Sequence, residues 1–215
     1  MHQTIKNLNL ITKELSSLEK KLPSIIAVSK TFSMSEIMPL IKFGHIHFGE
    51  NKVQEAVEKW TDVKKEFKNI KLHMIGKLQT NKVKYVIPLF DYIHSVDNIK
   101  LAAKISSEQK KINRNLKIFI QINLTNEIQK SGIEPGQLSN FYNICKNELG
   151  LNIVGLMCIP PNDDKSNYYF SEMKKLKSNL ELNDLSMGMS GDYLNAIQHG
   201  SSFIRVGSKI FGSRN

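Results

Sequence analysis

The sequence predicts a single (β/α)8 barrel over residues 1–215, with one extra helix at its N-terminus. Short apolar runs recur along the chain and alternate with segments of helical periodicity, which is the order of strands and helices in such a barrel. Several runs are continuously apolar, as in parallel strands that are covered on both faces. The length is near the lower limit for this fold, so we expect no second domain. An open, doubly wound parallel sheet is the alternative architecture.

The expected strands are eight apolar runs of four to seven residues, a length that suits barrel strands. The spacing between them leaves room for a helix or a long turn after each strand. They span Ile25–Ser29, Ile46–Gly49, Leu72–Gly76, Tyr92–Val96, Ile118–Leu124, Ile153–Ile159, Leu185–Met189 and Phe203–Gly207.

Four segments place apolar residues on one face of a helix. Val53, Val57 and Trp60 form one such stripe, and Asp97 is the expected N-cap of another helix. The first of the four segments is the extra helix that precedes the barrel. They span Gln3–Lys20, Asn51–Trp60, Ser95–Gln109 and Tyr168–Leu180.

The composition indicates a globular protein in a reducing compartment. No run approaches the roughly 20 apolar residues that cross a bilayer, and the first residues lack the basic start and apolar stretch of a secretory signal. Cys145 and Cys158 have the spacing of neither a disulfide framework nor a metal site. We therefore expect a cytoplasmic protein with no membrane partner.

The net charge of +10 raises the hypothesis of a nucleic-acid partner. The lysines are spread along the chain, and many fall where helices need a solvated face. The abundance of Lys, Asn and Ile together is typical of a biased genome. Basicity alone is a weak signal, so we expect no nucleic-acid partner.

Lys30 directly follows the first apolar run, and the ends of barrel strands are where functional groups collect. Side chains alternate along a strand, so Lys30 shares a face with Ile26 and Val28. Desolvation lowers the pKa of an amine and makes it a nucleophile toward aldehydes, as Schiff-base lysines require. The ordinary alternative is a lysine that reaches water along an apolar surface.

The last two strands end in residues suited to a phosphate group. Ser190 follows the seventh run, and Gly207 and Ser208 follow the eighth. Hydroxyl groups and the free N–H groups at a helix start bind phosphate, and this end of a barrel is a frequent phosphate site. Ordinary capping and turn formation is the alternative explanation.

Arg205 lies two residues before Gly207, so its side chain is expected to reach into the barrel mouth. A guanidinium group is always charged. Placed against a pyridine nitrogen, it would keep that nitrogen unprotonated. A salt bridge to a neighbouring carboxylate is the alternative.

Other motifs carry less weight. His45 and His47 share a strand face, but no Cys, Asp or Glu cluster accompanies them at ligand spacing, so we expect no metal. The glycines match neither a dinucleotide nor a Walker pattern, and no Gly-x-Ser-x-Gly elbow is present.

Nine stretches carry a resemblance to a known family, in order along nearly the whole chain. The chain resembles the pyridoxal phosphate homeostasis protein family, whose fold is the barrel of the alanine racemase N-terminal domain without that enzyme's extra β-domain. The matching stretches are Ala27–Thr31, Phe48–Glu55, His73–Lys82, Gln121–Asn123, Lys130–Gly132, Gly155–Met157, Leu185–Ser190, Gly200–Gly207 and Ile210–Gly212.

The resemblance implies that Lys30 carries pyridoxal 5′-phosphate (PLP) as an internal aldimine. It also implies that Asn51 lines the cofactor pocket, that Arg205 approaches the ring nitrogen, and that the phosphate lies at the strand ends described above. The expected cofactor-binding residues are Lys30, Asn51, Ser186, Ser190, Arg205, Gly207 and Ser208.

The function expected from this resemblance is PLP homeostasis, meaning storage, shielding and delivery of the cofactor, with an indirect effect on amino-acid and keto-acid balance. Racemisation needs a base on each face of the substrate, and in alanine racemases the extra domain supplies the second one, so we expect no strong catalysis and assign no catalytic residue. A low-activity PLP-dependent racemase is the alternative, and an interaction module using the basic surface is a third hypothesis. The expected protein is a monomer that contacts apoenzymes transiently.

Overall fold

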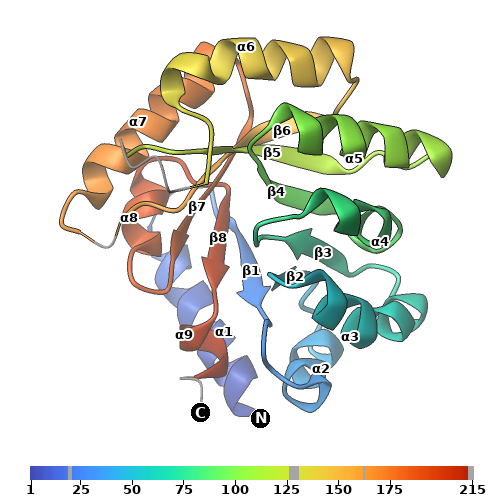
Figure 1. Ribbon diagram of the computed structural model, residues 1–215. Coiled ribbons are helices and arrows are strands. Elements are labelled where there is room, and N and C mark those ends of the chain that lie inside the picture. Colours follow the sequence, from blue (N-terminus) through green and yellow to red (C-terminus); the bar gives the residue numbers. More distant parts are fainter. Residues whose placement is uncertain (19–20, 126–130, 162, 213–215) are drawn as a thin grey trace.

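Eight parallel strands close into a barrel in chain order, with β8 hydrogen-bonded back to β1 (Figure 1). The computed structural model describes residues 1–18, 21–125, 131–161 and 163–212. The closed sheet confirms the predicted (β/α)8 fold, and the alternative of an open sheet is wrong. The strands are β1 (Ser24–Val28), β2 (His47–Glu50), β3 (Lys71–Met74), β4 (Tyr92–Val96), β5 (Lys117–Ile122), β6 (Ile153–Cys158), β7 (Asp184–Met189) and β8 (Phe203–Val206).

All eight apolar runs form strands, and the predicted ends differ from the observed ones by no more than two residues. Most strand positions are buried because helices cover the outer face while side chains fill the interior. The predicted runs overshoot mainly at their C-terminal ends, where apolar residues such as Ile75 and Ile159 leave the sheet and line a pocket.

Helices surround the barrel and connect successive strands (Figure 1). A π-helical turn, Ile144–Glu148, extends α6, and 3₁₀ turns occur at Thr80–Lys82 and Pro135–Gln137. Among the described residues, no helix has both the length and the apolar character that a membrane crossing requires. The helices are α1 (Gln3–Ser16), α2 (Met34–Lys42), α3 (Val53–Glu66), α4 (Val83–Leu89), α5 (Ile99–Lys111), α6 (Leu138–Asn143), α7 (Ser166–Asn179), α8 (Tyr193–Gln198) and α9 (Ser208–Phe211).

Three helix starts differ from the sequence prediction, and the smallest change is at α7, which begins at Ser166 rather than Tyr168. The N-cap of α5 is Asn98 rather than Asp97, because Oδ1 of Asn98 accepts the N–H of Leu101 at 2.8 Å. Helix α3 begins at Val53, so Asn51 stays outside the helix and its side chain is available to the barrel mouth.

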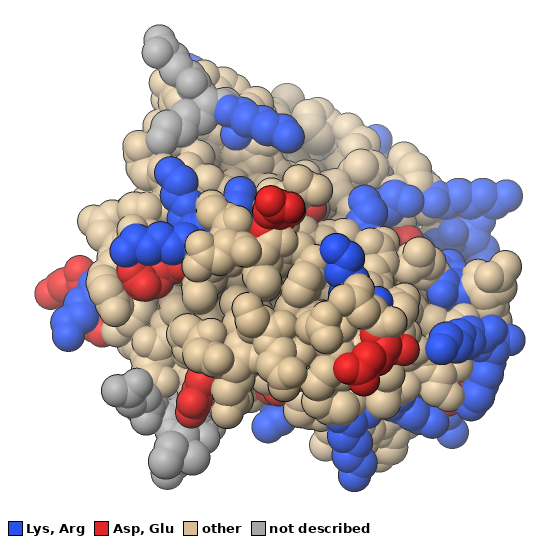
Figure 2. All heavy atoms as spheres, turned by 90° about the horizontal axis from the view of Figure 1, so that it is seen from above, with Lys and Arg blue, Asp and Glu red and all other residues tan. Residues whose placement is uncertain are grey.

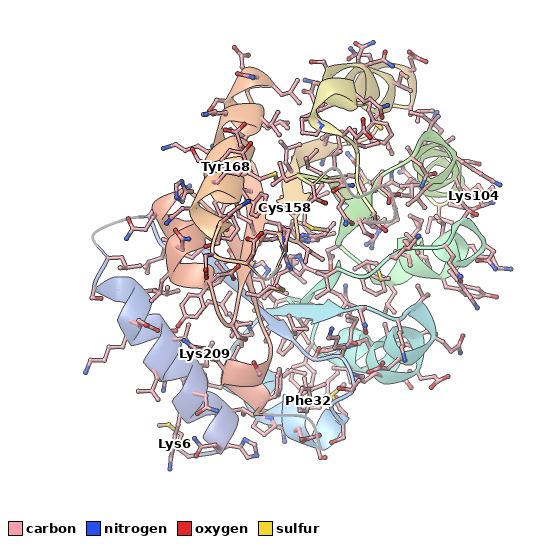
Figure 3. The ribbon with its side chains drawn as sticks, turned by 60° about the vertical axis from the view of Figure 1, so that its left-hand side comes forward. Lys6, Phe32, Lys104, Cys158, Tyr168 and Lys209 are labelled. Atoms are coloured by element: carbon pink, nitrogen blue, oxygen red, sulfur yellow. The ribbon has the colours of Figure 1, made fainter. Side chains whose placement is uncertain are left out.

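The extra helix α1, at the N-terminus, packs against the C-terminal helix α9. It also packs against α2, and Nδ2 of Asn7 donates to the carbonyl oxygen of Ile210 at 2.9 Å. Figure 3 shows α1 running beside α9. The helix ends at Ser16, and its predicted end at Lys20 lies outside the described residues, as does Lys130 of one matching stretch.

The positive charge is less evenly distributed than we expected. Residues 52–117 contain fifteen of the thirty Lys and Arg residues but seven of the twenty acidic residues, so this part of the chain carries +8 of the net +10. In Figure 2 the basic side chains are densest along the right-hand edge of the molecule. One flank of the barrel is therefore basic, while the remaining residues are close to neutral.

Candidate functional site

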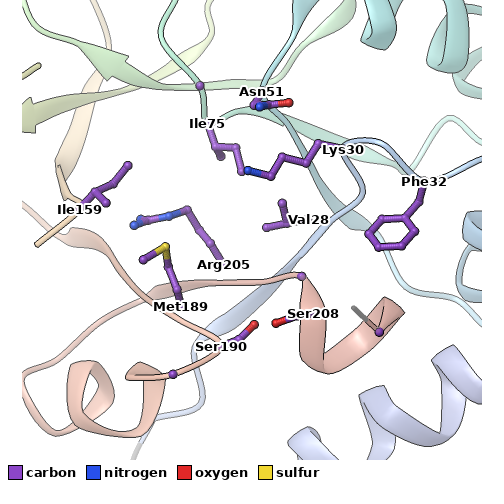
Figure 4. A pocket seen from close by; sticks show the side chains of 14 residues that line it. Val28, Lys30, Phe32, Asn51, Ile75, Ile159, Met189, Ser190, Arg205 and Ser208 are labelled. Atoms are coloured by element: carbon purple, nitrogen blue, oxygen red, sulfur yellow. The ribbon is translucent and has the colours of Figure 1, made fainter. Parts of the chain in front are cut away.

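A pocket of about 500 Å³ lies at the C-terminal ends of the strands, between the residues that follow β1, β7 and β8 (Figure 4). Lys30, two residues beyond the end of β1, extends its side chain into this pocket, and Val28 lines the same wall. Ile26, on the same face of β1, is fully buried in the barrel interior. The structure therefore places Lys30 at the barrel rim, as strand alternation predicts.

A buried carboxylate anchors the backbone that leads to Lys30. Glu50 is fully buried, and its Oε1 accepts hydrogen bonds from Oγ of Ser29 at 2.7 Å, Nε1 of Trp60 at 2.9 Å and Nζ of Lys59 at 3.1 Å. Burial raises the pKa of Glu50, and the charge of Lys59 opposes that rise. Lys59 also donates to the carbonyl oxygen of Ser29 at 2.9 Å. This cluster ties the end of β1 to α3.

A second carboxylate fixes the backbone on the other side of Lys30. The N–H of Thr31 donates to Oε1 of Glu55 at 2.6 Å, and Nζ of Lys59 lies 2.9 Å from the same oxygen. Thr31 has φ of 69°, a left-handed conformation that costs free energy for a β-branched residue. Lys30 is thus held between two anchored peptide groups. Sequence reasoning missed this brace, although the matching stretch Phe48–Glu55 contains both carboxylates.

The wall opposite Lys30 offers hydrogen-bond donors. The hydroxyl oxygens of Ser190 and Ser208 point toward one another, and Gly207 lines the same wall (Figure 4). The first N–H groups of α9 follow Gly207 and have no acceptor within the helix. Hydroxyl and amide donors in this arrangement suit the oxygens of a phosphate group.

Arg205 approaches the pocket from the interior face of β8 and is 5% exposed. Its Nη1 donates to the carbonyl oxygen of Ser186 at 2.7 Å, and its Nη2 donates to that of Cys158 at 2.8 Å. Burial lowers the pKa of Arg205, but a guanidinium group starts so high that it keeps its charge. No carboxylate among the described residues forms an ion pair with Arg205, so the structure does not support the salt-bridge alternative.

Ser186 lies beneath the pocket instead of lining it. The residue is fully buried on β7, and its hydroxyl accepts a hydrogen bond from Nη1 of Arg205 at 2.8 Å. Its hydroxyl lies between His94 and Arg205, and the residue is not part of the pocket lining. A direct cofactor contact at Ser186 stays a prediction, and the bond that the structure shows is the one to Arg205.

Asn51 lies beside Lys30 at the pocket wall (Figure 4). Its Oδ1 is buried, and no residue that the structure describes donates a hydrogen bond to it. Buried oxygens are normally paired, so this atom fits a pocket that receives a polar ligand. Gly76 packs so closely on Asn51 that a Cβ there would lie 2.7 Å from the Asn51 Cα. Only glycine fits at this position without a backbone shift.

The structure brings six of the seven predicted residues to one pocket and places Ser186 outside its lining. Sequence reasoning missed an apolar part of the wall. Four of these residues, Ile75, Gly76, Ile159 and Met189, form the C-terminal ends of predicted apolar runs, which is the signal that could have revealed them. The missed lining residues are Phe32, Ile75, Gly76, Ile159, Met189, Gly191 and Gly212.

The structure supplies no metal site among the residues that it describes, where no group of three His, Cys, Asp or Glu side chains is placed to hold an ion. Nε2 of His45 lies 2.9 Å from the carbonyl oxygen of His47, whereas Nδ1 of His47 lies 2.9 Å from Nε2 of His73, so the two rings have different partners. Burial raises the pKa of the Cys145 and Cys158 thiols to about 12.

Comparison with known proteins gives the same fold. The family model "Alanine racemase, N-terminal domain" matches residues 6–215. The solved structure of an alanine racemase from Clostridium difficile superposes with a TM-score of 0.74 at 15% identity, and covers 97% of this chain and 57% of the racemase chain. At this identity the likeness shows a common fold. The fold and the lysine at the end of β1 define a barrel of the alanine racemase N-terminal-domain class.

Nearer relatives cover the whole chain. Proteins named pyridoxal phosphate homeostasis protein are 35% identical in Haemophilus influenzae, over 97% of this chain and 95% of the relative, and in Vibrio cholerae, over 100% and 98%. The solved structure of PipY from Synechococcus elongatus without PLP has a TM-score of 0.89 and 31% identity over 98% of this chain and all of the other. The same protein with PLP bound has a TM-score of 0.87. The chain belongs to the pyridoxal phosphate homeostasis protein family.

Proposed function

We propose that this protein binds PLP in the pocket at the C-terminal end of the barrel and serves in PLP homeostasis. The observation that carries the proposal is the convergence of an amine, a buried guanidinium group and a pair of hydroxyls on one pocket: Lys30, Arg205, Ser190 and Ser208. Relatives that share at least 31% of their sequence with this chain are named for this function or solved with PLP bound.

The described residues fit the parts of the cofactor. Nζ of Lys30 is the proposed covalent anchor, which condenses with the aldehyde and releases water. Ser190, Ser208 and the backbone at Gly207, which line the pocket, would hold the phosphate, and Arg205 would lie toward the ring nitrogen. When bound, PLP supplies an electrophilic aldehyde and a ring that withdraws electrons. The fixed positive charge of Arg205 disfavours a proton on the ring nitrogen and so weakens that withdrawal.

The proposed role is reversible holding and delivery, with little catalysis. Lys30 is the one side chain of the described pocket lining that serves as a base, because Arg205 keeps its proton and the other polar lining residues are Asn51, Ser190 and Ser208. Racemisation needs a base on each face of the substrate. We propose that small amines and apoenzymes take the cofactor from Lys30 by exchange, and that the protein works as a cytoplasmic monomer.

The anchor is tested by reconstituting the protein with PLP, reducing it with borohydride and mapping the modified peptide. We expect stoichiometric visible absorbance and a modification at Lys30, both lost in Lys30→Ala. Lys77→Ala is the matched control, because Lys77 is exposed and lies next to Gly76 of the pocket wall. A colourless wild type, or modification of Lys77 in place of Lys30, would refute the proposal.

The delivery role has a separate test. Loaded protein and an equal concentration of free PLP are each mixed with an apoenzyme, and the recovery of its activity is timed. We expect faster or more complete recovery from the loaded protein. The alternative, a low-activity racemase, predicts exchange of the α-hydrogen of an amino acid in deuterated water, and no exchange across a broad amino-acid panel would exclude it.

A further inference from the structure

A column of polar side chains crosses the barrel interior, which apolar layers normally fill. Nδ1 of His47 lies 2.9 Å from Nε2 of His73, and Nδ1 of His73 lies 2.9 Å from Nε2 of His94. Nδ1 of His94 lies 2.9 Å from Oγ of Ser186. The same Ser186 oxygen accepts a hydrogen bond from Nη1 of Arg205 at 2.8 Å. The column therefore links β2 to the pocket through β3, β4, β7 and β8.

Apolar rings enclose the column. His73 and His94 are fully buried, and each stacks on an aromatic ring: His73 on Tyr92 with centroids 4.2 Å apart, and His94 on Phe119 at 4.4 Å. Water has no access to imidazoles packed in this way, so each ring depends on its neighbours in the column for hydrogen bonds. A break at one member leaves buried polar atoms without partners.

The three imidazoles are neutral near pH 7. Burial lowers the pKa of His73 and His94 well below the ordinary value, and the charge of Arg205 acts in the same direction on His94. The pKa of the half-buried His47 falls to about 4, again mainly through burial. A neutral imidazole has one donor and one acceptor nitrogen. The hydrogen bonds of the column must therefore all point the same way.

Arg205 decides which way they point. A guanidinium group can only donate, so it occupies one lone pair of the Ser186 hydroxyl. The serine hydrogen then donates to Nδ1 of His94, which leaves the His94 proton on Nε2, where it faces His73. Nε2–H of His94 then donates to Nδ1 of His73, and Nε2–H of His73 donates to Nδ1 of His47. With the opposite polarity, Ser186 would accept from both sides, and no described residue accepts a hydrogen bond from its hydroxyl in that case.

We propose that Ser186 and His94 are positioning residues for Arg205, and that Arg205 in turn fixes the protons of all three histidines on Nε2. The inference rests on the proposed function in one respect, namely that Arg205 faces the ring nitrogen of the cofactor. Nη1 and Nη2 are both held from behind, by Ser186 and by the carbonyl of Cys158. The guanidinium group therefore presents its charge to the pocket in one fixed orientation.

The first test uses the protein without cofactor. Nitrogen-15 NMR of labelled histidines distinguishes the two neutral tautomers, and we expect the Nε2–H form at His47, His73 and His94. In Ser186→Ala the donor to His94 is lost, so His94 should become a mixture of tautomers. His45→Gln is the control, since His45 lies outside the column, and should leave all three unchanged. An Nδ1–H tautomer at His94 in the wild type, or no response to Ser186→Ala, would overturn the proposal.

The second test uses protein loaded with PLP. His94→Phe keeps the aromatic contact with Phe119 but loses the bond to Ser186, whereas His94→Asn keeps an acceptor near the position of Nδ1. We expect PLP to bind about fivefold to tenfold more weakly to His94→Phe, with a shifted pH midpoint of the visible absorbance, and within about twofold of wild type to His94→Asn.

A purely structural role for the column would lower the melting temperature of His94→Phe and leave both PLP affinity and the pH midpoint unchanged, which would overturn the inference. If the wild type itself bound no PLP, the proposed function would fail. The tautomer measurement would still decide the inference, because it requires no cofactor.

Discussion

Replacing Lys59 with methionine tests whether the buried carboxylate behind β1 depends on its cation. The side chain of Lys59 is 10% exposed and that of Glu50 is fully buried. Methionine retains most of the length of lysine but removes the charge, so Lys59→Met leaves Glu50 buried without an opposite charge. Removing one partner of a buried ion pair costs about 3–5 kcal/mol. Taking the lower value, we expect Tm to fall by roughly 6–12 °C for a chain of this size.

The comparison variant is Lys65→Met on the same helix. Lys65 pairs with Asp62, but its side chain is 73% exposed, and exposed ion pairs contribute about 0–1 kcal/mol. Thermal and urea unfolding followed by circular dichroism give the difference between the two variants. The double variant Glu50→Gln with Lys59→Met should recover part of the loss, because it removes the uncompensated charge. Equal stability of the two lysine variants, or no recovery in the double variant, would refute the reasoning.

The cost of Lys59→Met should also depend on pH. Burial raises the pKa of folded Glu50 above that of the unfolded chain, so folding favours the protonated carboxyl. Without Lys59 only the hydrogen bonds from Trp60 and Ser29 oppose that rise. As the pH falls, Glu50 takes up a proton in the variant and no longer needs a cation. The stability difference between wild type and variant should therefore shrink as the pH is lowered into the acidic range and grow as it is raised, as measured by urea unfolding at a series of pH values.

Two further predictions follow from packing and burial. Gly76→Ala should destabilise the protein by about 1–3 kcal/mol and weaken PLP binding, because the new Cβ meets the backbone of Asn51. Gly191→Ala in the same pocket should change stability little, since nothing lies within 4 Å of its Cβ position. Equal unfolding curves for the two variants would contradict this. Cys145 and Cys158, with pKa values of about 12, should resist a thiol-reactive probe at pH 8 and react only on unfolding. Labelling is detected by mass spectrometry. Rapid labelling of the native protein would contradict the buried environment of the two thiols.

Helix prediction was incomplete for a physical reason. Helices α2 and α4 have nine and seven residues, and each contains a proline, Pro39 or Pro88. So few turns give little periodicity, and an internal proline normally argues against a helix. The capping error at Asp97 has a similar origin, since two adjacent residues are both good N-caps and the hydrogen bond to Leu101 selects the second.

By itself the sequence determined the alternation of strands and helices, and it placed Lys30 and Arg205 on the inner face at the ends of their strands. Those conclusions rest on local periodicity, which is written in neighbouring residues. Only the tertiary structure decided which distant residues hydrogen-bond to these strand ends and hold them in place. The bond between His94 and Ser186 joins residues 92 positions apart, and that between Lys59 and Ser29 joins residues 30 apart. The first contact crosses the interior of the closed barrel, and the second packs α3 against the end of β1, so no local pattern in the chain encodes either.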